Sequence, residues 1–193
     1  MKLKKELSAS KKTWDESTIN CKGKLSSNYI SDWVCESESF TTELPSDLSP
    51  YKDTGAKNLI SDLSRMPKYK GTLYRVCDAP GFSDGKVKKG DTVITKRLLS
   101  FSSSLEFVKS FSGGRSVFFV LAASESAHNI SGARPEQAES VVDIDSAFKV
   151  EKIITTKKGF MVVHLQEIAG QVSYGGARDM YTGEQFLNMK KIC

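Results

Sequence analysis

The chain of 193 residues is 39% hydrophobic, 9% aromatic and 26% charged, a composition that suits one packed domain and excludes a disordered polar chain. The longest apolar run, 117–123, is far shorter than the roughly 20 residues of a membrane-spanning helix, so we expect no membrane insertion. The net charge of +5 suits an anionic ligand or partner, but a charge of this size does not identify nucleic acid.

The first third of the chain is predicted to be helical. Residues 1–53 combine a basic start with a later acidic stretch, and we expect short helices that cover the core of the same domain. The first lysines are not followed by an apolar segment, so we expect no secretion signal. A further helix is predicted to begin near Thr54 and to end before Pro67. Four apolar residues recur there at helical spacing: Leu59, Ile60, Leu63 and Met66.

From residue 71 onward the apolar period changes to two, which indicates strands. We predict a strand at 72–77, a turn-rich loop at 78–90 and a second strand at 91–100. Ser104 is expected to cap a short helix. Five more strands are predicted, at 116–122, 127–131, 139–144, 147–155 and 160–168. Helices followed by many short antiparallel strands predict an α+β fold, with residues 54–193 as its core.

Cysteine and histidine are few and scattered. The four cysteines lie at positions 21, 35, 77 and 193, without the short spacings of a zinc site, and we expect them to be reduced. His128 and His164 each stand in an alternating apolar segment, where a place in a strand is the expected explanation. We therefore expect no metal site.

Three short motifs of polar residues occur at the ends or starts of predicted strands. Arg75 ends a predicted strand, a Ser100-x-Ser102 pair closes a later one, and Gln137-Ala138-Glu139 opens a third. This order resembles the arginine, Ser-x-Ser and Gln/Glu-x-Glu motifs of the mono-ADP-ribosyltransferase toxins. The stretch 111–115, Phe-Ser-Gly-Gly-Arg, is similar to the loop that covers nicotinamide in the Rho-modifying clostridial exoenzymes. The resemblance covers about 54–168.

The residue types fit the chemistry of NAD. A guanidinium binds phosphate oxygens in pairs, so Arg75, with Arg115 as a second candidate, is expected to bind the diphosphate. Cleavage of the nicotinamide–ribose bond passes through an oxocarbenium-like state that a carboxylate stabilises, and Glu139 takes this role.

The remaining candidates are assigned in the same way. Ser100 is expected to hydrogen-bond Glu139 or the nicotinamide ribose, with Ser102 as a further NAD-binding candidate. Gln137, two residues before Glu139 in a strand-edge loop, is expected to point to the same side as Glu139 and toward the acceptor. Phe111 is a candidate platform for nicotinamide.

Each residue also has an ordinary structural explanation. Arg75 could form an ion pair at a sheet edge, Ser100 and Ser102 could end a strand before a helix, and the Gln-x-Glu segment could be a surface loop. Phe111 has the spacing of a core residue, and Arg115 could flank a hairpin. The function alternatives are an NAD glycohydrolase, or a non-catalytic nucleotide- or protein-binding module.

Some positions depart from the family pattern. Val76 follows the strand-end arginine where glycine is common, and Phe101 stands between the serines where threonine is common. Three residues before Gln137 the Rho-modifying exoenzymes carry an aromatic residue, whereas this chain has Arg134. We therefore expect the NAD chemistry to be retained and the target to differ.

The resemblance implies a helical N-terminal portion packed on two antiparallel β-sheets that form an NAD-binding cleft. It also implies transfer of ADP-ribose from NAD, without a metal, to a macromolecular acceptor, a protein in preference to nucleic acid. Glutamine at position 137 favours a neutral acceptor such as asparagine or a nucleobase, because an amide cannot deprotonate a guanidinium. We expect a phage or bacterial effector that acts in the cytoplasm of its producer or of a target cell after delivery.

Overall fold

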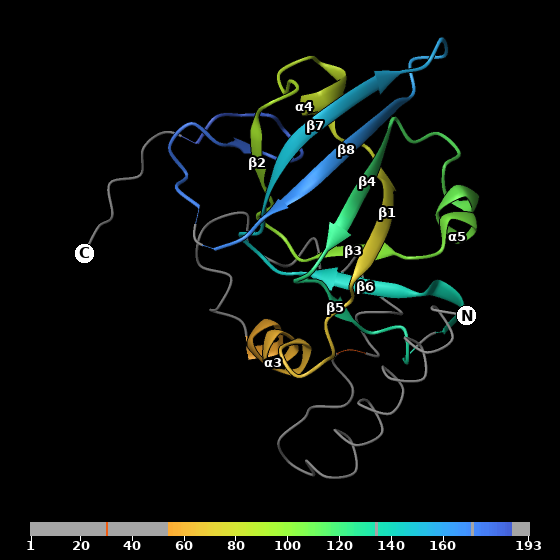
Figure 1. Cartoon of the computed structure of the whole chain (residues 1–193), viewed down its shortest axis with the longest axis vertical. Helices are drawn as coiled ribbons and strands as arrows, with labels where there is room; N and C mark the ends of the chain where they lie inside the picture. Colours follow the sequence, from red (N-terminus) through yellow and green to blue (C-terminus); the bar gives the residue numbers. More distant parts are fainter. Residues whose placement is uncertain (1–29, 31–53, 134, 171, 187–193) are drawn as a thin grey trace. The chain divides into compact units, whose positions relative to one another are not determined.

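The computed structural model describes residue 30 and residues 54–133, 135–170 and 172–186 (Figure 1). Apart from Ile30, the helical portion predicted for 1–53 lies outside the described residues. The described residues divide into two compact units. The first contains 54–70, 97–103 and 125–143, and the second contains 71–96, 104–124 and 144–186. No helix in these segments is long and apolar enough to cross a membrane.

The first unit is built around a buried strand. Strand β6 (Glu139–Val142) pairs in antiparallel fashion with β5 (His128–Asn129) on one side and with β3 (Leu99–Ser102) on the other. All four β6 residues are buried. Helix α3 (Thr54–Leu63) begins where the sequence predicts and ends before Pro67, although Met66 of the apolar pattern lies beyond it, and the helix buries Leu59 and Leu63. Strand β3 carries Ser100 and Ser102, and β6 begins with the glutamate of the Gln-x-Glu motif.

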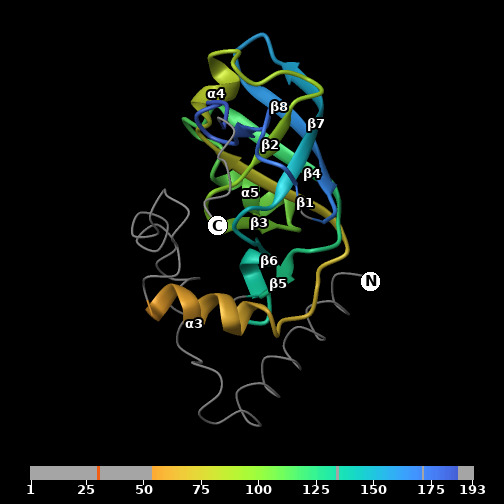
Figure 2. The same ribbon diagram turned by 90° about the vertical axis from the view of Figure 1, so that its left-hand side faces the viewer.

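The second unit contains a six-stranded ladder in the order β1-β4-β8-β7-β2-β9. The strands are β1 (Gly71–Cys77), β4 (Val117–Ser124), β8 (Met161–Ile168), β7 (Ala147–Thr155), β2 (Thr92–Ile94) and β9 (Arg178–Asp179). The first four lie side by side (Figures 1 and 2). Leu73, Phe119 and Val163 are among the fully buried residues of these strands. The short helices α4 (Pro80–Ser83) and α5 (Leu105–Ser110) complete this unit.

Most of the predicted elements are confirmed. Strands β1, β4, β6, β7 and β8 lie where the period-two pattern predicts, and Ser104 caps α5 by accepting a hydrogen bond from the Phe107 amide at 3.2 Å. The predicted strand 127–131 shortens to the two residues of β5. Helix α4 within the predicted loop 78–90, and β9 in the glycine-containing tail, were not predicted. Within the described residues the fold is mostly β, with only short helices.

Two predictions about the strands are wrong. The segment 91–100 is not one strand, because its first part pairs with β7 as β2 and its last part pairs with β6 as β3. The strands also do not form the two antiparallel sheets expected, since β4 pairs with β8, and β2 with β9, in parallel. Parallel neighbours are joined by long connections, and no local pattern in either strand records which distant strand will lie beside it.

Lys96 connects the C-terminal segment of the second unit to the region that follows β2. Lys96 Nζ lies 3.7 Å from the centre of the Tyr174 ring and 5.0 Å from that of Phe186, and it pairs with Asp145 Oδ1 at 3.0 Å. The lysine side chain is only 10% exposed. Tyr174 and Phe186 in turn pack against a buried cluster that includes Ile94 and Ala177. The cation and the two rings therefore join the segment after β8 to β2.

Replacing Lys96 with alanine is expected to lower the free energy of unfolding by about 1–2 kcal/mol, because it removes a partly desolvated cation–π contact together with an ion pair. The control is Lys149→Ala, which removes the exposed Lys149–Glu151 pair of 3.1 Å and should cost at most about 0.5 kcal/mol. Urea unfolding of both variants measures the difference. An equal loss in the free energy of unfolding for the two variants would contradict a stabilising role of the Lys96 contacts.

Candidate active site

The Ser-x-Ser and Gln-x-Glu motifs meet in the first unit. The antiparallel register of β3 and β6 places Ser102 opposite Glu139 and Ser100 opposite Val141. The Ser100 hydroxyl donates a hydrogen bond to Glu139 Oε1. Glu139 is only 7% exposed, and a carboxylate at that depth needs hydrogen-bond donors to offset its lost hydration. Ser100 is one such donor.

The turn that carries Gln137 is held by the second serine. Gln137 ends a 3-10 helix (Pro135–Gln137), and Ala138 follows with φ of +47° before β6 begins. The Ser102 hydroxyl donates to the Gln137 carbonyl at 2.6 Å, and the Ser103 amide donates to the Ala138 carbonyl at 3.0 Å. These bonds help to maintain a backbone conformation that alanine rarely adopts.

The structure does not support the geometric argument for placing Gln137 on the same side as Glu139. The i and i+2 rule applies to extended residues, whereas Gln137 is in a 3-10 helix and Ala138 is left-handed. Gln137 is nevertheless half-buried and only two residues from Glu139 in the same tight turn. The assignment of Gln137 to the acceptor side thus depends on the family motif and not on strand geometry.

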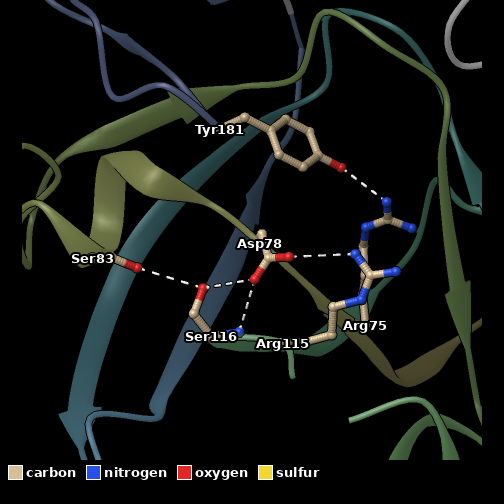
Figure 3. Close-up of polar contacts among 6 residues, drawn as sticks. All are labelled: Arg75, Asp78, Ser83, Arg115, Ser116 and Tyr181. Atoms are coloured by element: carbon tan, nitrogen blue, oxygen red, sulfur yellow. Dashed lines mark hydrogen bonds and ion pairs between the residues drawn. The ribbon is translucent and has the colours of Figure 1, made fainter. Parts of the chain in front are cut away.

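Arg75 lies in β1 of the second unit, where it is half-buried. Its Nη2 atom donates a hydrogen bond of 2.9 Å to the Tyr181 hydroxyl (Figure 3). Burial by itself lowers the pKa of Arg75, but the contacts with Tyr181 and Cys77 raise it, and the net change is upward. Burial also raises the pKa of the Cys77 thiol, although Arg75 opposes this change. The guanidinium stays charged beside a neutral thiol.

Arg115 is held in a different way. Its Nη1 atom lies 3.4 Å from Asp78 Oδ2, and the two side chains are 47% and 53% exposed. The other oxygen of Asp78 accepts hydrogen bonds of 3.1 Å from both the amide and the hydroxyl of Ser116 (Figure 3). An exposed ion pair of this kind contributes little stability. Arg115 can therefore exchange Asp78 for an anionic ligand at low cost.

Phe111 is not a core residue, so the interpretation of its spacing with Val108 as a core pattern is wrong. Helix α5 ends at Ser110, and Phe111 follows as its C-cap, where helical spacing no longer decides which way a side chain faces. The ring is 57% exposed, and it contacts Phe107 with 4.9 Å between ring centres. This exposed aromatic ring, four residues before Arg115, remains available to stack on a planar ligand.

The predicted residues thus fall into two groups. Ser100, Ser102, Gln137 and Glu139 lie in the first unit, whereas Arg75, Phe111 and Arg115 lie in the second. In the described part of the chain no three metal-binding side chains gather.

Sequence reasoning missed Asp78, Ser116 and Tyr181. Asp78 directly follows strand β1, and a charged residue at the end of a predicted strand could have been singled out from the sequence. Tyr181 lies 106 residues after Arg75, and no local pattern could have connected the two.

No family model and no curated protein matches the sequence. Solved structures do resemble the fold. The ADP-ribosyltransferase Vis from Vibrio splendidus, in complex with an inhibitor, has a TM-score of 0.75 at 21% identity over 96% of this chain and 91% of its own. The ADP-ribosyltransferase toxin Plx2a from Paenibacillus larvae has a TM-score of 0.61 at 16% identity, over 88% of this chain and 98% of its own.

The C3 exoenzyme of Clostridium limosum has a TM-score of 0.60 at 13% identity, over 86% of this chain and 95% of its own. These matches extend over most of both chains in each pair. They also agree with the resemblance drawn from the arginine, Ser-x-Ser and Gln-x-Glu motifs. The chain therefore has the fold of the bacterial mono-ADP-ribosyltransferase toxins.

Proposed function

We propose that this protein is a mono-ADP-ribosyltransferase that transfers ADP-ribose from NAD to a neutral acceptor group on a macromolecule. The observation that carries the proposal is that the Ser-x-Ser and Gln-x-Glu motifs are hydrogen-bonded to each other in the first unit. Ser100 donates to the buried Glu139 carboxylate, and Ser102 donates to the Gln137 carbonyl at 2.6 Å. The fold of the ADP-ribosyltransferase toxins supports the transfer of ADP-ribose from NAD.

In this reaction the bond between the ribose C1′ carbon and the nicotinamide nitrogen breaks, and its electron pair leaves with nicotinamide. Positive charge grows on the ribose, and the fixed negative charge of Glu139 stabilises it. The acceptor atom then bonds to C1′ and releases its proton to water. Ser100 keeps the Glu139 carboxylate in one orientation, which matters because small displacements of a catalytic group are costly.

The two arginines are assigned to the NAD diphosphate. Arg75 is the principal candidate because its contacts with Tyr181 and Cys77 hold a charged guanidinium without neutralising it. Arg115 is the second candidate, because its exposed pair with Asp78 is easily exchanged. Phe111, which is 57% exposed, is proposed to stack against nicotinamide.

The proposed acceptor is neutral, and a protein in preference to nucleic acid. Glutamine at position 137 offers an amide where a second carboxylate would bind or deprotonate a guanidinium. Vis has been solved in complex with agmatine, a small guanidine compound. Agmatine is therefore a direct test of whether this chain accepts guanidines, and we expect that it does not.

We further propose that the protein is a phage or bacterial effector acting in the cytoplasm of its producer or of a target cell. Two of the similar proteins, Vis and Plx2a, are described as toxins, which supports a role directed against another cell's components.

The decisive experiment is incubation of the full chain with labelled NAD and bacterial or eukaryotic lysate, followed by mass spectrometry of the labelled molecules. We expect label on an asparagine-like side chain or a nucleobase. Release of free ADP-ribose with no labelled macromolecule would indicate an NAD glycohydrolase. Absence of NAD consumption in every lysate would indicate a non-catalytic binding module.

The first prediction concerns the carboxylate. Glu139→Gln should lower the rate of transfer at least ~10²-fold, because it removes the charge that stabilises the oxocarbenium-like state while it preserves side-chain shape. The matched control is Glu136→Gln, since Glu136 is exposed and lies one residue outside the motif. Initial rates of nicotinamide release measure both variants. A near-normal rate for Glu139→Gln would remove Glu139 from the catalytic site.

The second prediction concerns the diphosphate. Arg75→Ala should weaken NAD binding about tenfold or more, and Arg75→Lys should restore little of it, because lysine lacks the paired donor geometry of a guanidinium. The exposed Arg65 provides a control as Arg65→Ala. Calorimetry with NAD checks the affinities, and thermal unfolding checks that each variant is folded. An NAD affinity unchanged by Arg75→Ala would refute the assignment.

The third prediction separates transfer from hydrolysis. Gln137→Ala should reduce transfer to the macromolecule about tenfold or more, while slow hydrolysis of NAD by water persists, because water needs no orienting contact. Gln137→Glu should gain activity toward agmatine. Labelled NAD with and without acceptor measures the two rates. If Gln137→Ala lowered both rates by one factor, Gln137 would belong to the NAD-cleaving groups and the argument for a neutral acceptor would fail.

A further inference from the structure

The hydrogen bond between Arg75 and Tyr181 joins a candidate NAD-binding residue to a turn near the end of the described chain. Arg75 Nη2 donates to the Tyr181 hydroxyl at 2.9 Å, across 106 residues of sequence (Figure 3). The proposed function uses Arg75 and treats Tyr181 only as an uncharged contact of that arginine. The turn 179–183, which carries this tyrosine, is called the Tyr181 turn below.

The Tyr181 turn is stiffened by an aspartate at its start. Asp179 Oδ1 accepts hydrogen bonds from the amides of Tyr181 and Thr182, at 2.9 and 2.8 Å. The Gly183 amide closes the turn by donating to the Asp179 carbonyl at 2.9 Å. An aspartate side chain that binds the amides following it is a strong turn-forming arrangement. The backbone on both sides of Tyr181 therefore has little freedom.

The same turn is anchored to two other elements of the second unit. The Gly81 amide of α4 donates to the Tyr181 carbonyl at 2.7 Å, and the Met180 amide donates to the Ile94 carbonyl at 3.0 Å. The Met180 side chain is fully buried. The backbones of Gly81 and Gly183 approach so closely that a Cβ atom on Gly81 would lie 2.3 Å from the Gly183 nitrogen. The phenol is thus held at a fixed place beside β1.

We propose that Tyr181 is a positioning residue that holds the Arg75 guanidinium in the orientation that binds the diphosphate of NAD. An arginine side chain loses much rotamer freedom when it binds a ligand, and a partner that orders it beforehand reduces this cost. Tyr181 can do so without neutralising the arginine, because a phenol hydroxyl is an uncharged hydrogen-bond partner. This inference rests on the proposed function, and Tyr181 acts through Arg75.

The test compares ligands with and without the diphosphate. Calorimetry on the full chain measures affinities for ADP-ribose, which has the diphosphate, and for nicotinamide riboside, which lacks it. The variants are Tyr181→Phe, Arg75→Ala and the double variant. The control is Tyr174→Phe, because Tyr174 belongs to the same C-terminal segment but contacts Lys96 and Phe186.

Tyr181→Phe keeps the ring and removes only the hydroxyl. We expect it to weaken ADP-ribose binding about fivefold to tenfold, the size of one ordinary net hydrogen bond, and to leave nicotinamide riboside binding unchanged. In the Arg75→Ala background it should have no further effect. Tyr174→Phe should bind both ligands like the parent protein.

Three results would overturn the inference. If Arg75→Ala weakens ADP-ribose binding and Tyr181→Phe does not, Tyr181 has only a structural role and the proposed function stands. If Tyr181→Phe weakens binding equally with and without Arg75, Tyr181 contacts the ligand itself. If Arg75→Ala leaves the affinity unchanged, the assignment of Arg75 in the proposed function fails, and the inference fails with it.

A second variant tests the same idea should Tyr181→Phe not fold. Asp179→Ala retains Tyr181 and removes the two side-chain bonds that stiffen its turn. It should weaken ADP-ribose binding about twofold to fivefold, with nicotinamide riboside unchanged. An equal loss for the two ligands would overturn the positioning role.

Discussion

Burial of the Glu139 carboxylate is the constraint on which the first unit depends. A carboxylate that is 7% exposed is expensive unless donors replace its hydration. Ser100 supplies one donor, and it can do so only in the observed register, in which Ser102 faces Glu139. A slip by one residue would move every β3 side chain to the opposite face. The pairing of β3 with β6 therefore explains why both serines, two residues apart, lie beside the Gln-x-Glu motif.

The same register explains why a turn can precede the glutamate so closely. Once Ser102 is opposite Glu139, its hydroxyl reaches back to the Gln137 carbonyl. That bond and the one from the Ser103 amide to the Ala138 carbonyl hold Ala138 at its positive φ. One strand pairing thus orders the carboxylate and the turn that carries Gln137.

The two arginines of the second unit show two ways of presenting positive charge. Arg75 is half-buried against a hydroxyl and a thiol that leave its charge intact, whereas Arg115 is exposed and shares its charge with Asp78. A preordered cation binds an anion with less loss of entropy. A surface pair can exchange partners because water already screens it. Arg75 is therefore suited to a fixed contact and Arg115 to one formed when a ligand arrives.

The sequence by itself determined the elements whose signals are local. The spacing of Leu59 and Leu63 predicted α3, the alternation along 147–155 predicted β7, and Ser104 marked the start of α5. The order of three motifs also predicted the fold. Only the tertiary structure decided which strands pair, that 91–100 divides between two partners, and that Phe111 is exposed. It alone placed Tyr181 against Arg75. Such contacts join residues far apart in the chain, and their geometry depends on backbone packing that no local pattern encodes.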